Sequence, residues 1–508
     1  MTITDYMRNI AFINLTVINE TCQNLISQDK TVAATIIDYC NALPDIELII
    51  PIGLTLDQIK IFYPQKTPGN YILLEENSIK RLIESMAEKA EGYDNCIYVY
   101  GDTPLLDRVL TEKMFQNHYK YYADYSFADG YPYGLSPEIL GSGCLKQLIP
   151  LAHGENGTIQ RDSLFNCLQK DINAFDIETE ISERDMRLKR ISLSCDTRRN
   201  WLQLQRILAA GGRDCASIIE MDDTIEQYTR TLPAYFQIQL CERCMQSCSY
   251  CPYPGVNPDH LRAGREISLD NISDLACRID DFAPDSTLSL SLWGDPSTHS
   301  CLDQVLDSII SRTGLKIVIE TSGLGWEGFL QKNPECLKSD RIEWIFSLDA
   351  MDAALYKKLR GEGQEEVLLT IEKFRSVNPD HTWIQAVRMK DNEDDLEQFY
   401  RFWKEKTENV IIQKYDFFNG ALEQRKVTDL SPLNRFPCWH LKREMTILLD
   451  GTVVLCREDL KGNYKLGNAF KQSLSELWEE ADSVFQSHIK SCYTGICENC
   501  DEYYTYNF

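Results

Sequence analysis

Residues 235–251 read YFQIQLCERCMQSCSYC, so a run typical of a β-strand leads directly into four cysteines. Within it, Cys244, Cys248 and Cys251 are separated by three and then two residues. Three thiolates on one short loop can bind three irons of a four-iron cluster and leave the fourth iron open for chemistry. The alternative is a zinc site, because Cys241–Cys244 and Cys248–Cys251 are also two CxxC pairs.

Apolar runs of strand length alternate with helical patterns on both sides of this loop. This alternation predicts an α/β fold with largely parallel sheets, and ligands bind at the carboxyl ends of such strands. From the cysteine loop onward we expect strands at 235–240, 287–292, 315–320, 342–348, 383–389 and 410–415. A hairpin with an Asp450-Gly451 turn and a helix near Leu474–Trp478 break this rhythm. We therefore predict three domains: residues 1–222, 223–430 and 431–508.

The cysteine loop resembles the defining motif of radical S-adenosylmethionine (radical SAM) enzymes, which have an aromatic residue before the third cysteine, here Tyr250. The resemblance extends over most of residues 235–420 and implies a partial (β/α)6 barrel. Gly294 and Asp295 end the second expected strand and resemble the family's Gly-Glu segment, with Asp where Glu is usual. That segment binds the amino group of the cofactor's methionine moiety.

The ends of the later strands carry further residues that resemble the family's pattern. Ser322 closes the third strand, Ser347 and Asp349 close the fourth, and Arg360 follows in the next helix and loop. Taken one at a time, the glycines suit ordinary turns and the charged residues suit a solvated surface. Taken in order, the resemblance implies that S-adenosylmethionine is bound by Tyr250, Gly294, Asp295, Ser322, Ser347, Asp349 and Arg360. It also implies a low-potential electron donor of the flavodoxin or ferredoxin type.

Five cysteines gather near the end of the chain, at positions 438, 456, 492, 497 and 500. The tract resembles the SPASM extension of radical SAM enzymes, which carries auxiliary iron–sulfur clusters. We expect an auxiliary [4Fe–4S] cluster bound by Cys438, Cys456, Cys497 and Cys500, with Cys492 either spare or substituting for one of them. Structural zinc is the alternative, because Cys₄ sites use the same ligands.

The first 222 residues form their own strand–helix pattern, with strands expected at 9–15, 47–50 and 96–100 and a helix at 78–90. Asp102, Tyr133 and Asp196 lie in segments that resemble sugar-nucleotide cytidylyltransferases of the nucleotide-diphospho-sugar transferase fold, in which an Asp like Asp102 binds the metal. However, residues 14–20 (NLTVINE) contain no Gly, Lys or Arg to surround a triphosphate. We therefore expect this domain to keep the fold without nucleotidyl transfer.

Composition limits the partners and the compartment. The chain has 508 residues and a formal net charge of −25, which does not favour binding to a nucleic-acid backbone. No run approaches the roughly 18 apolar residues of a membrane span, and the first residues do not resemble a secretory signal. We expect a cytoplasmic protein whose 19 cysteines serve as thiolate ligands or buried thiols rather than disulfides.

The whole arrangement resembles the spirochaete-type spiro-SPASM proteins. We expect an enzyme that reductively cleaves S-adenosylmethionine at the first cluster, so that a 5′-deoxyadenosyl radical abstracts hydrogen from a substrate. The substrate is left open between a peptide or protein and a sugar-type compound. Two alternatives remain: a cytidylyltransferase-like enzyme with sensory iron–sulfur domains, and a non-catalytic iron–sulfur redox or scaffold protein.

Overall fold

The computed structural model describes residues 7–504 except for residues 28, 153–157, 263, 333, 429 and 430. The chain divides into two compact units, residues 1–231 (unit 1) and residues 232–508 (unit 2). Unit 2 thus contains the predicted tail and the predicted central domain except for its residues 223–231, which belong to unit 1. The boundaries expected after residues 222 and 430 stay predictions, and residue 430 itself lies outside the described residues.

Unit 1 is built on a sheet whose described strands follow the order β3-β2-β1-β4-β6-β5-β7. The strands are β1 (Asn9–Asn14), β2 (Ile46–Gly53), β3 (Ile72–Leu73), β4 (Asn95–Tyr100), β5 (Tyr125–Asp129), β6 (Glu138–Gly141) and β7 (Ile177–Ile181). The first four strands are parallel, while β6 pairs antiparallel with both β4 and β5. Every residue of β1 and of β4 is buried, as expected for strands covered on both faces.

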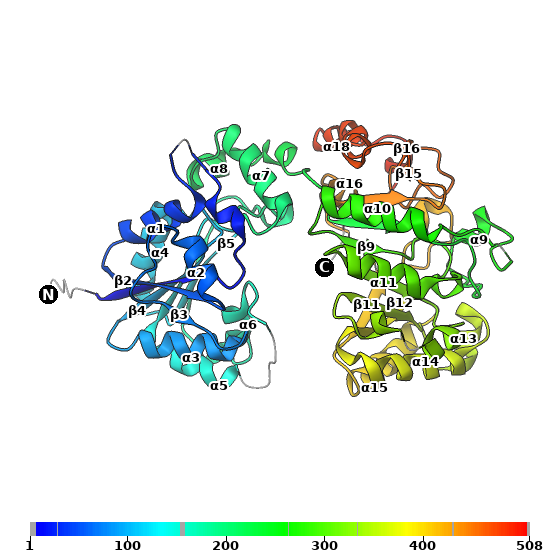
Figure 1. Cartoon of the computed structure of the whole chain (residues 1–508), viewed down its shortest axis with the longest axis horizontal. Helices are drawn as coiled ribbons and strands as arrows, with labels where there is room; N and C mark the ends of the chain where they lie inside the picture. Colours follow the sequence, from blue (N-terminus) through cyan, green and yellow to red (C-terminus); the bar gives the residue numbers. More distant parts are fainter. Residues whose placement is uncertain are drawn as a thin grey trace. The chain divides into compact units, whose positions relative to one another are not determined.

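Helices cover both faces of this sheet. Figure 1 shows α1 (Val32–Ala42) and α4 (Arg108–Tyr121) on one side of the strands and α3 (Ile79–Lys89) and α5 (Ser142–Leu151) on the other. The side chains of α3 that repeat every three to four residues are all buried, in agreement with the predicted helix: Ile79, Leu82, Ile83 and Met86. Two apolar cores result, one on each face of the sheet. The other described helices of unit 1 include α2 (Leu56–Phe62), α6 (Ser163–Gln169), α7 (Arg198–Ala209) and α8 (Cys215–Glu220).

Unit 2 contains the six parallel strands that the sequence predicts, paired in chain order. They are β8 (Tyr235–Ile238), β9 (Thr287–Ser289), β10 (Lys316–Thr321), β11 (Ile342–Ser347), β12 (Thr382–Arg388) and β13 (Val410–Lys414). The helices between them include α9 (Tyr253–Val256), α10 (Leu269–Phe282), α11 (Leu302–Arg312), α12 (Glu327–Lys332), α13 (Ala353–Arg360), α14 (Gln364–Val377) and α15 (Glu393–Lys404).

The alternation along β11 distinguishes the two faces of this sheet. Trp344 and Phe346 pack on Phe374 of α14, with ring centroids 5.0 Å apart in both pairs. Ile345 and Ser347 alternate with these residues along the strand and therefore point to the opposite face. That opposite face carries the polar side chains described below.

The tail of the chain continues the sheet of unit 2. Strand β14 (Glu444–Ile447) pairs in parallel with β8, and β15 (Thr452–Val454) and β16 (Lys465–Asn468) follow antiparallel, so β8 is not an edge strand. Helices α16 (Trp439–Arg443), α17 (Leu474–Glu480) and α18 (Asp482–Ile489) complete the tail. Figure 1 shows α16 and α18 beside the end of this sheet. In the described part of the chain, no helix has the length and apolar character needed to cross a membrane.

Candidate active site and cluster-binding loops

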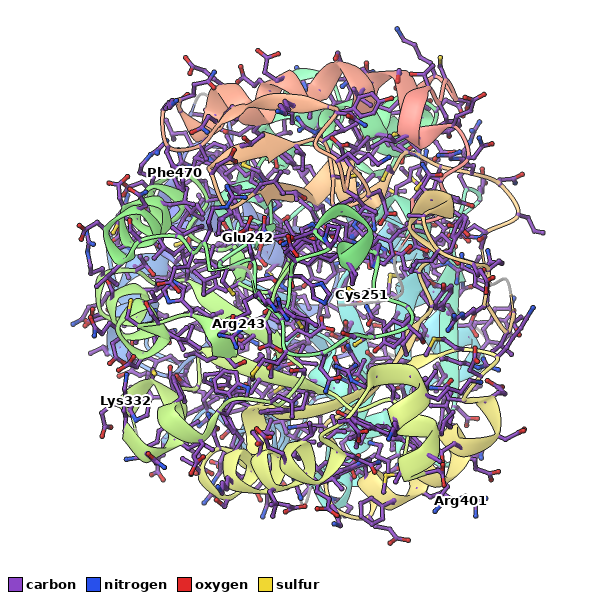
Figure 2. All side chains as sticks on the ribbon, turned by 90° about the vertical axis from the view of Figure 1, so that its right-hand side faces the viewer. Glu242, Arg243, Cys251, Lys332, Arg401 and Phe470 are labelled. Carbon is purple, nitrogen blue, oxygen red and sulfur yellow. The ribbon has the colours of Figure 1, made fainter. Side chains whose placement is uncertain are left out.

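The cysteine loop lies between β8 and α9. The backbone N–H of Cys251 donates to the carbonyl of Cys248 at 3.1 Å, and that of Cys244 donates to the carbonyl of His260 at 3.2 Å. Burial and, to a smaller extent, the neighbouring Cys248 raise the pKa of the Cys251 thiol to about 12. Since a ligating thiol must lose its proton, iron binding here releases protons. In Figure 2, Cys251 lies near the middle of the view with Glu242 and Arg243, while Lys332 and Arg401 lie at the rim.

Cys241, which precedes the three-cysteine motif, has a partner in the protein. Its Sγ donates to the carbonyl of Asp295 at 3.1 Å, and the N–H of Asp295 donates to the carbonyl of Arg243 at 2.7 Å. Gly294 has a φ of 79°, and a Cβ there would collide with the carbonyl oxygen of Cys241. Only glycine meets both demands, so the end of β9 packs directly against the start of the cysteine loop.

The carboxylate of Asp295 joins the ends of β9 and β10. Its Oδ1 accepts from Thr321 Oγ1 at 2.8 Å and from the Ser297 N–H at 3.0 Å. Its Oδ2 accepts from the N–H of Ser322 at 2.8 Å and from Ser322 Oγ at 2.6 Å. The sequence-predicted residues Asp295 and Ser322 are therefore in direct contact. Whether this pair binds the cofactor's amino group stays a prediction.

Tyr250, Asp349 and Arg360, which come from three separate segments, also meet. Arg360 Nη1 donates to Asp349 Oδ2 at 2.6 Å and to the Tyr250 hydroxyl at 2.5 Å, and that hydroxyl donates to Asp349. Asp349 Oδ1 accepts the Val387 N–H of β12 at 2.7 Å. Asp349 adopts a φ of 67°, a strained conformation for a residue other than glycine, which the surrounding hydrogen bonds maintain.

Ser347 belongs to a different polar group, on the face of the sheet away from α14. Its Oγ donates to Glu320 Oε1 at 3.2 Å, and Gln385 Nε2 donates to the same oxygen at 2.8 Å. The sequence analysis did not assign Glu320 to the site. The position of Glu320 on β10 could have identified it. Glu320 alternates with the buried Ile319 and Thr321 and therefore points to the polar face of the sheet.

The four cysteines predicted for the tail line one cavity. Cys438 precedes α16, Cys456 follows β15, and Cys497 and Cys500 come from the end of the chain. Cys492 is exposed and does not line this cavity. Burial and, to a smaller extent, Cys497 raise the pKa of the Cys438 thiol to about 12, as expected for thiols that face a shared space.

One wall of the tail cavity is charged. Arg457 and Glu458 follow Cys456 directly, and Arg457 Nη2 forms an ion pair with Asp416 at 2.7 Å. Burial and the neighbouring Asp416 carboxyl raise the pKa of Glu458 well above its usual value. Glu502, two residues after Cys500, forms an ion pair with Lys414 at 2.7 Å. Charged residues thus pack directly beside the predicted cluster ligands.

The donor sets of both loops fit iron–sulfur clusters. Three cysteines on the first loop leave one iron open, and four cysteines around the tail cavity suit a fully ligated cluster. Among the described residues, no group of three or more His, Cys, Asp and Glu side chains is close enough to hold a single metal ion.

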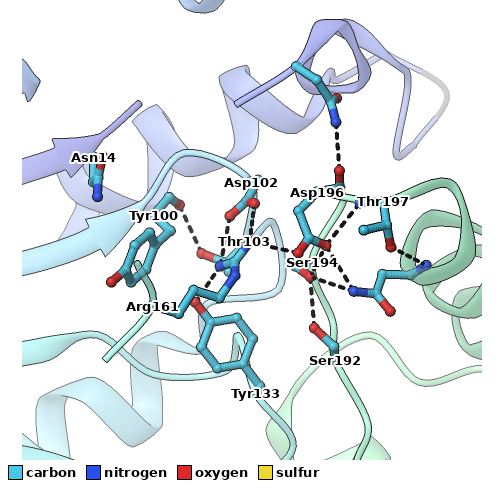
Figure 3. A network of polar contacts seen from close by, with 12 residues as sticks. Asn14, Tyr100, Asp102, Thr103, Tyr133, Arg161, Ser192, Ser194, Asp196 and Thr197 are labelled. Atoms are coloured by element: carbon cyan, nitrogen blue, oxygen red, sulfur yellow. Dashed lines mark hydrogen bonds and ion pairs between the residues drawn. The ribbon is translucent and has the colours of Figure 1, made fainter. Parts of the chain in front are cut away.

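Unit 1 contains a second polar cluster, at the carboxyl end of β4 (Figure 3). The guanidinium of Arg161 donates to both carboxylate oxygens of Asp102, and its Nη2 lies 3.1 Å from Asp196 Oδ2. Arg161 also donates to the Tyr133 hydroxyl and stacks over the rings of Tyr100 and Tyr133. Burial raises the pKa of Asp102, and Arg161 only partly offsets this effect.

The sequence analysis named Asp102, Tyr133 and Asp196 but missed Arg161. Two carboxylates that converge at strand ends need a positive charge, and residues 14–20 offer none. The need for a positive charge is therefore the feature that could have led to Arg161, which forms ion pairs with both carboxylates. Both carboxylates are thus ion-paired with a residue of the chain itself, which offsets one of their two negative charges.

Comparison with known proteins bears on unit 2 most directly. Residues 238–402 match the Radical SAM superfamily, and residues 438–501 match SPASM, described as an iron–sulfur cluster-binding domain. An uncharacterized protein of Treponema pallidum is 36% identical over 358 residues, which are 68% of this chain and 98% of that protein.

Solved structures with similar folds have lower identity. Streptococcus suis SuiB bound to the precursor peptide SuiA is 16% identical, covering 70% of this chain and 87% of that chain with a TM-score of 0.44. A cytidylyltransferase from Leptospira borgpetersenii is 13% identical, covering 44% of this chain and 96% of that chain with a TM-score of 0.36.

Proposed function

Because the chain belongs to the radical SAM superfamily and carries a SPASM iron–sulfur cluster-binding domain, we propose that it reductively cleaves S-adenosylmethionine to begin hydrogen abstraction from a substrate. One observation supports the proposal above all. The cysteine loop is hydrogen-bonded to the ends of two other segments that carry the expected cofactor residues, through Cys241 with Asp295 and through Tyr250 with Asp349.

The chain's own residues bind and orient, whereas the bound cluster supplies the single electron that cleaves S-adenosylmethionine. Cys244, Cys248 and Cys251 hold the cluster. We assign Gly294, Asp295 and Ser322 to the amino group of the methionine moiety and Ser347 to the ribose. We assign Tyr250 to the adenine. Asp349 holds Arg360, whose guanidinium suits the methionine carboxylate.

The tail takes the auxiliary cluster. We assign its ligands to Cys438, Cys456, Cys497 and Cys500, which line one cavity, and leave out the exposed Cys492. Full ligation by four thiolates suits electron transfer or substrate positioning rather than cofactor cleavage. The external electron donor is of the low-potential flavodoxin or ferredoxin type.

The rival proposal, nucleotidyl transfer by unit 1, has less support. A metal that bridges phosphates needs free carboxylates, but Asp102 and Asp196 both form ion pairs with Arg161. A pure iron–sulfur scaffold is also disfavoured, because it has no use for polar side chains arranged at the ends of three neighbouring strands: Asp295, Ser322 and Asp349.

The deciding experiment reconstitutes the protein anaerobically, adds dithionite and S-adenosylmethionine, and measures 5′-deoxyadenosine. Wild-type protein is expected to produce it. Cys248→Ala removes one of three thiolates and is expected to abolish it while the tail keeps its iron. If this variant forms 5′-deoxyadenosine at the wild-type rate, the assignment of the loop is wrong.

Cys241→Ser is the matched control on the same loop. A serine hydroxyl can still donate to the Asp295 carbonyl, so this variant is expected to keep both loop iron and cofactor cleavage. If zinc instead occupied the two CxxC pairs, Cys241→Ser would remove a ligand and lose the metal. Metal content of the two variants therefore separates the cluster from zinc.

A further inference from the structure

Arg360 is a buried cation with an unused hydrogen-bond donor. Its side chain is 4% exposed, and that of its ion-pair partner Asp349 is fully buried. The Nη1 group is fully used by Asp349 and Tyr250, at 2.6 and 2.5 Å. The Nε–H has no hydrogen-bond partner among the described residues. A buried donor without a partner is costly, so a ligand that accepts a hydrogen bond from this edge of the guanidinium would be favoured.

The Arg360 side chain is fixed against the cysteine loop. Arg360 ends helix α13, and the N–H of Ser249 donates to the carbonyl of its neighbour Leu359 at 2.7 Å. On the other side of Cys248, Gln246 Nε2 donates to the hydroxyl of Tyr356 in the same helix at 3.1 Å. The end of α13 is therefore bonded to the loop on both sides of Cys248.

Arg360 lies against the part of the loop that contains Cys248. Its Nη1 donates to the hydroxyl of Tyr250, two residues after Cys248, and its helix is hydrogen-bonded to Gln246 and Ser249 on either side of Cys248. The reduction potential of an iron–sulfur cluster depends on nearby charge, on hydrogen bonds to its sulfurs and on its exposure to solvent.

We propose that Tyr250 and Asp349 hold Arg360 as a fixed positive charge beside Cys248, which makes the first cluster easier to reduce. The inference rests on the proposed function, in which one electron from the external donor enters this cluster. That electron adds one negative charge to the cluster and its three thiolates, and a guanidinium in a poorly solvated site favours the more negative state. Arg360 is thus a positioning residue for the electron as well as a candidate for the cofactor carboxylate.

The test is a redox titration of the first cluster, followed by electron paramagnetic resonance without S-adenosylmethionine. It uses the full-length chain with Cys497→Ala and Cys500→Ala, so that only the first cluster contributes. Adding Arg360→Met is expected to shift the midpoint potential to a more negative value. Arg360→Lys keeps the charge without the planar geometry and is expected to shift it less.

Arg425→Met is the matched control. Arg425 Nη1 donates to Ser249 Oγ at 3.0 Å, so it contacts the same loop, but its side chain is 23% exposed and water screens its charge. We expect no shift in this variant. Iron content and circular dichroism show whether Arg360→Met folds and keeps its cluster, and if it does not, Arg360→Lys and Asp349→Asn give the comparison.

The outcomes separate this inference from the proposed function. An unchanged midpoint in a folded, iron-loaded Arg360→Met protein overturns the inference. So does an unchanged midpoint with weaker S-adenosylmethionine binding, because Arg360 would then act only as a ligand of the cofactor carboxylate. If the midpoint shifts as expected but wild-type protein forms no 5′-deoxyadenosine, the electrostatic role stands and the proposed function fails.

Discussion

Polar side chains at the strand ends of both units are bonded to one another before any ligand is present. Asp295 uses both carboxylate oxygens on Thr321, Ser297 and Ser322, and Asp102 uses both of its oxygens on Arg161. Such prior bonding lowers the entropy lost when a ligand binds, but it also makes each member essential to its partners. Two substitutions test this at the level of single residues.

The first substitution is Arg161→Met in unit 1. It leaves the Asp102 carboxylate buried without its counter-charge, and removing one partner of a buried ion pair costs about 3–5 kcal/mol. The side chain of Arg161 is 23% exposed, so water recovers part of that cost, and we expect a loss of about 2–3 kcal/mol. Urea unfolding of the variant measures it. The control is Arg184→Met, which removes an exposed arginine that pairs with Asp222 and Asp223, and equal stability of the two variants would contradict the account.

The second substitution is Asp295→Ala in unit 2. It removes the acceptor that holds Thr321 and Ser322 in place and the carboxylate predicted to face the cofactor's amino group. Hydrogen bonds to charged groups contribute about 1.5–3 kcal/mol each, so S-adenosylmethionine should bind at least about tenfold more weakly. A binding titration measures the change. Unchanged affinity would return Asp295 to an ordinary turn residue.

At the level of residues, the sequence predicts those site residues that follow one another at short intervals along the chain. Cys244, Cys248 and Cys251 can be recognised by two short intervals in the sequence. Cys492, expected to be either spare or a substitute ligand, does not line the tail cavity, and its role stays a prediction. Arg161 and Glu320 do not belong to any such short interval. Segments far apart in the chain bring Arg161 to Asp102, and Glu320 to Ser347 and Gln385, and only these contacts indicate a role.

At the level of elements, the sequence predicts the strands of unit 2, but it predicts only some of the pairings between them. The alternation of apolar and polar residues places β10, β11 and β12 within a residue or two, because side-chain burial is a local property. The pairing of β14 with β8 joins residues about 200 positions apart in the chain. No local pattern encodes that contact, so the sequence does not indicate that the tail extends the same sheet.

The joint between the end of β9 and the cysteine loop is testable at Gly294. Gly294→Ala places a Cβ against the Cys241 carbonyl and forces alanine into a φ of 79°, which costs about 1–2 kcal/mol in backbone strain alone. We expect the loop to shift and the first cluster to be lost on purification, while the iron of the tail remains. Iron analysis of the variant measures this.

Gly255→Ala is the control for that joint. Gly255 lies in α9, four residues after Cys251, and a Cβ there has no atom within 4 Å. It should keep wild-type iron. If Gly294→Ala also keeps all its iron, the close approach of the two segments does not matter for the cluster.

For the whole molecule, the two units differ in what they leave available for ligands. Unit 2 contains two sets of cysteines, and none of them forms a disulfide. Unit 1 resembles a nucleotidyltransferase-like domain, but both of its clustered carboxylates form ion pairs with Arg161. The chemistry of the molecule should therefore depend on unit 2 and on how much iron it holds.

The amount of iron is the next prediction. Three ligands at the first site and four at the second give about eight irons per chain when each holds a [4Fe–4S] cluster. A zinc tail would instead give about four irons and one zinc. Elemental analysis of anaerobically reconstituted protein decides between them, and one zinc per chain would remove the auxiliary cluster from the molecule.

The last prediction is that only one of the two clusters responds to S-adenosylmethionine. An iron with a vacant position can accept the cofactor's amino and carboxylate groups, whereas an iron already bound by a cysteine cannot. Adding S-adenosylmethionine should therefore change the spectrum of the Cys497→Ala/Cys500→Ala protein, which keeps the first cluster. It should leave the spectrum of a triple alanine variant at Cys244, Cys248 and Cys251 unchanged, because the tail cavity supplies four thiolates to its own cluster. A spectral change in the triple variant would mean that the tail cluster has an open iron, and the division of roles between the two sites would be wrong.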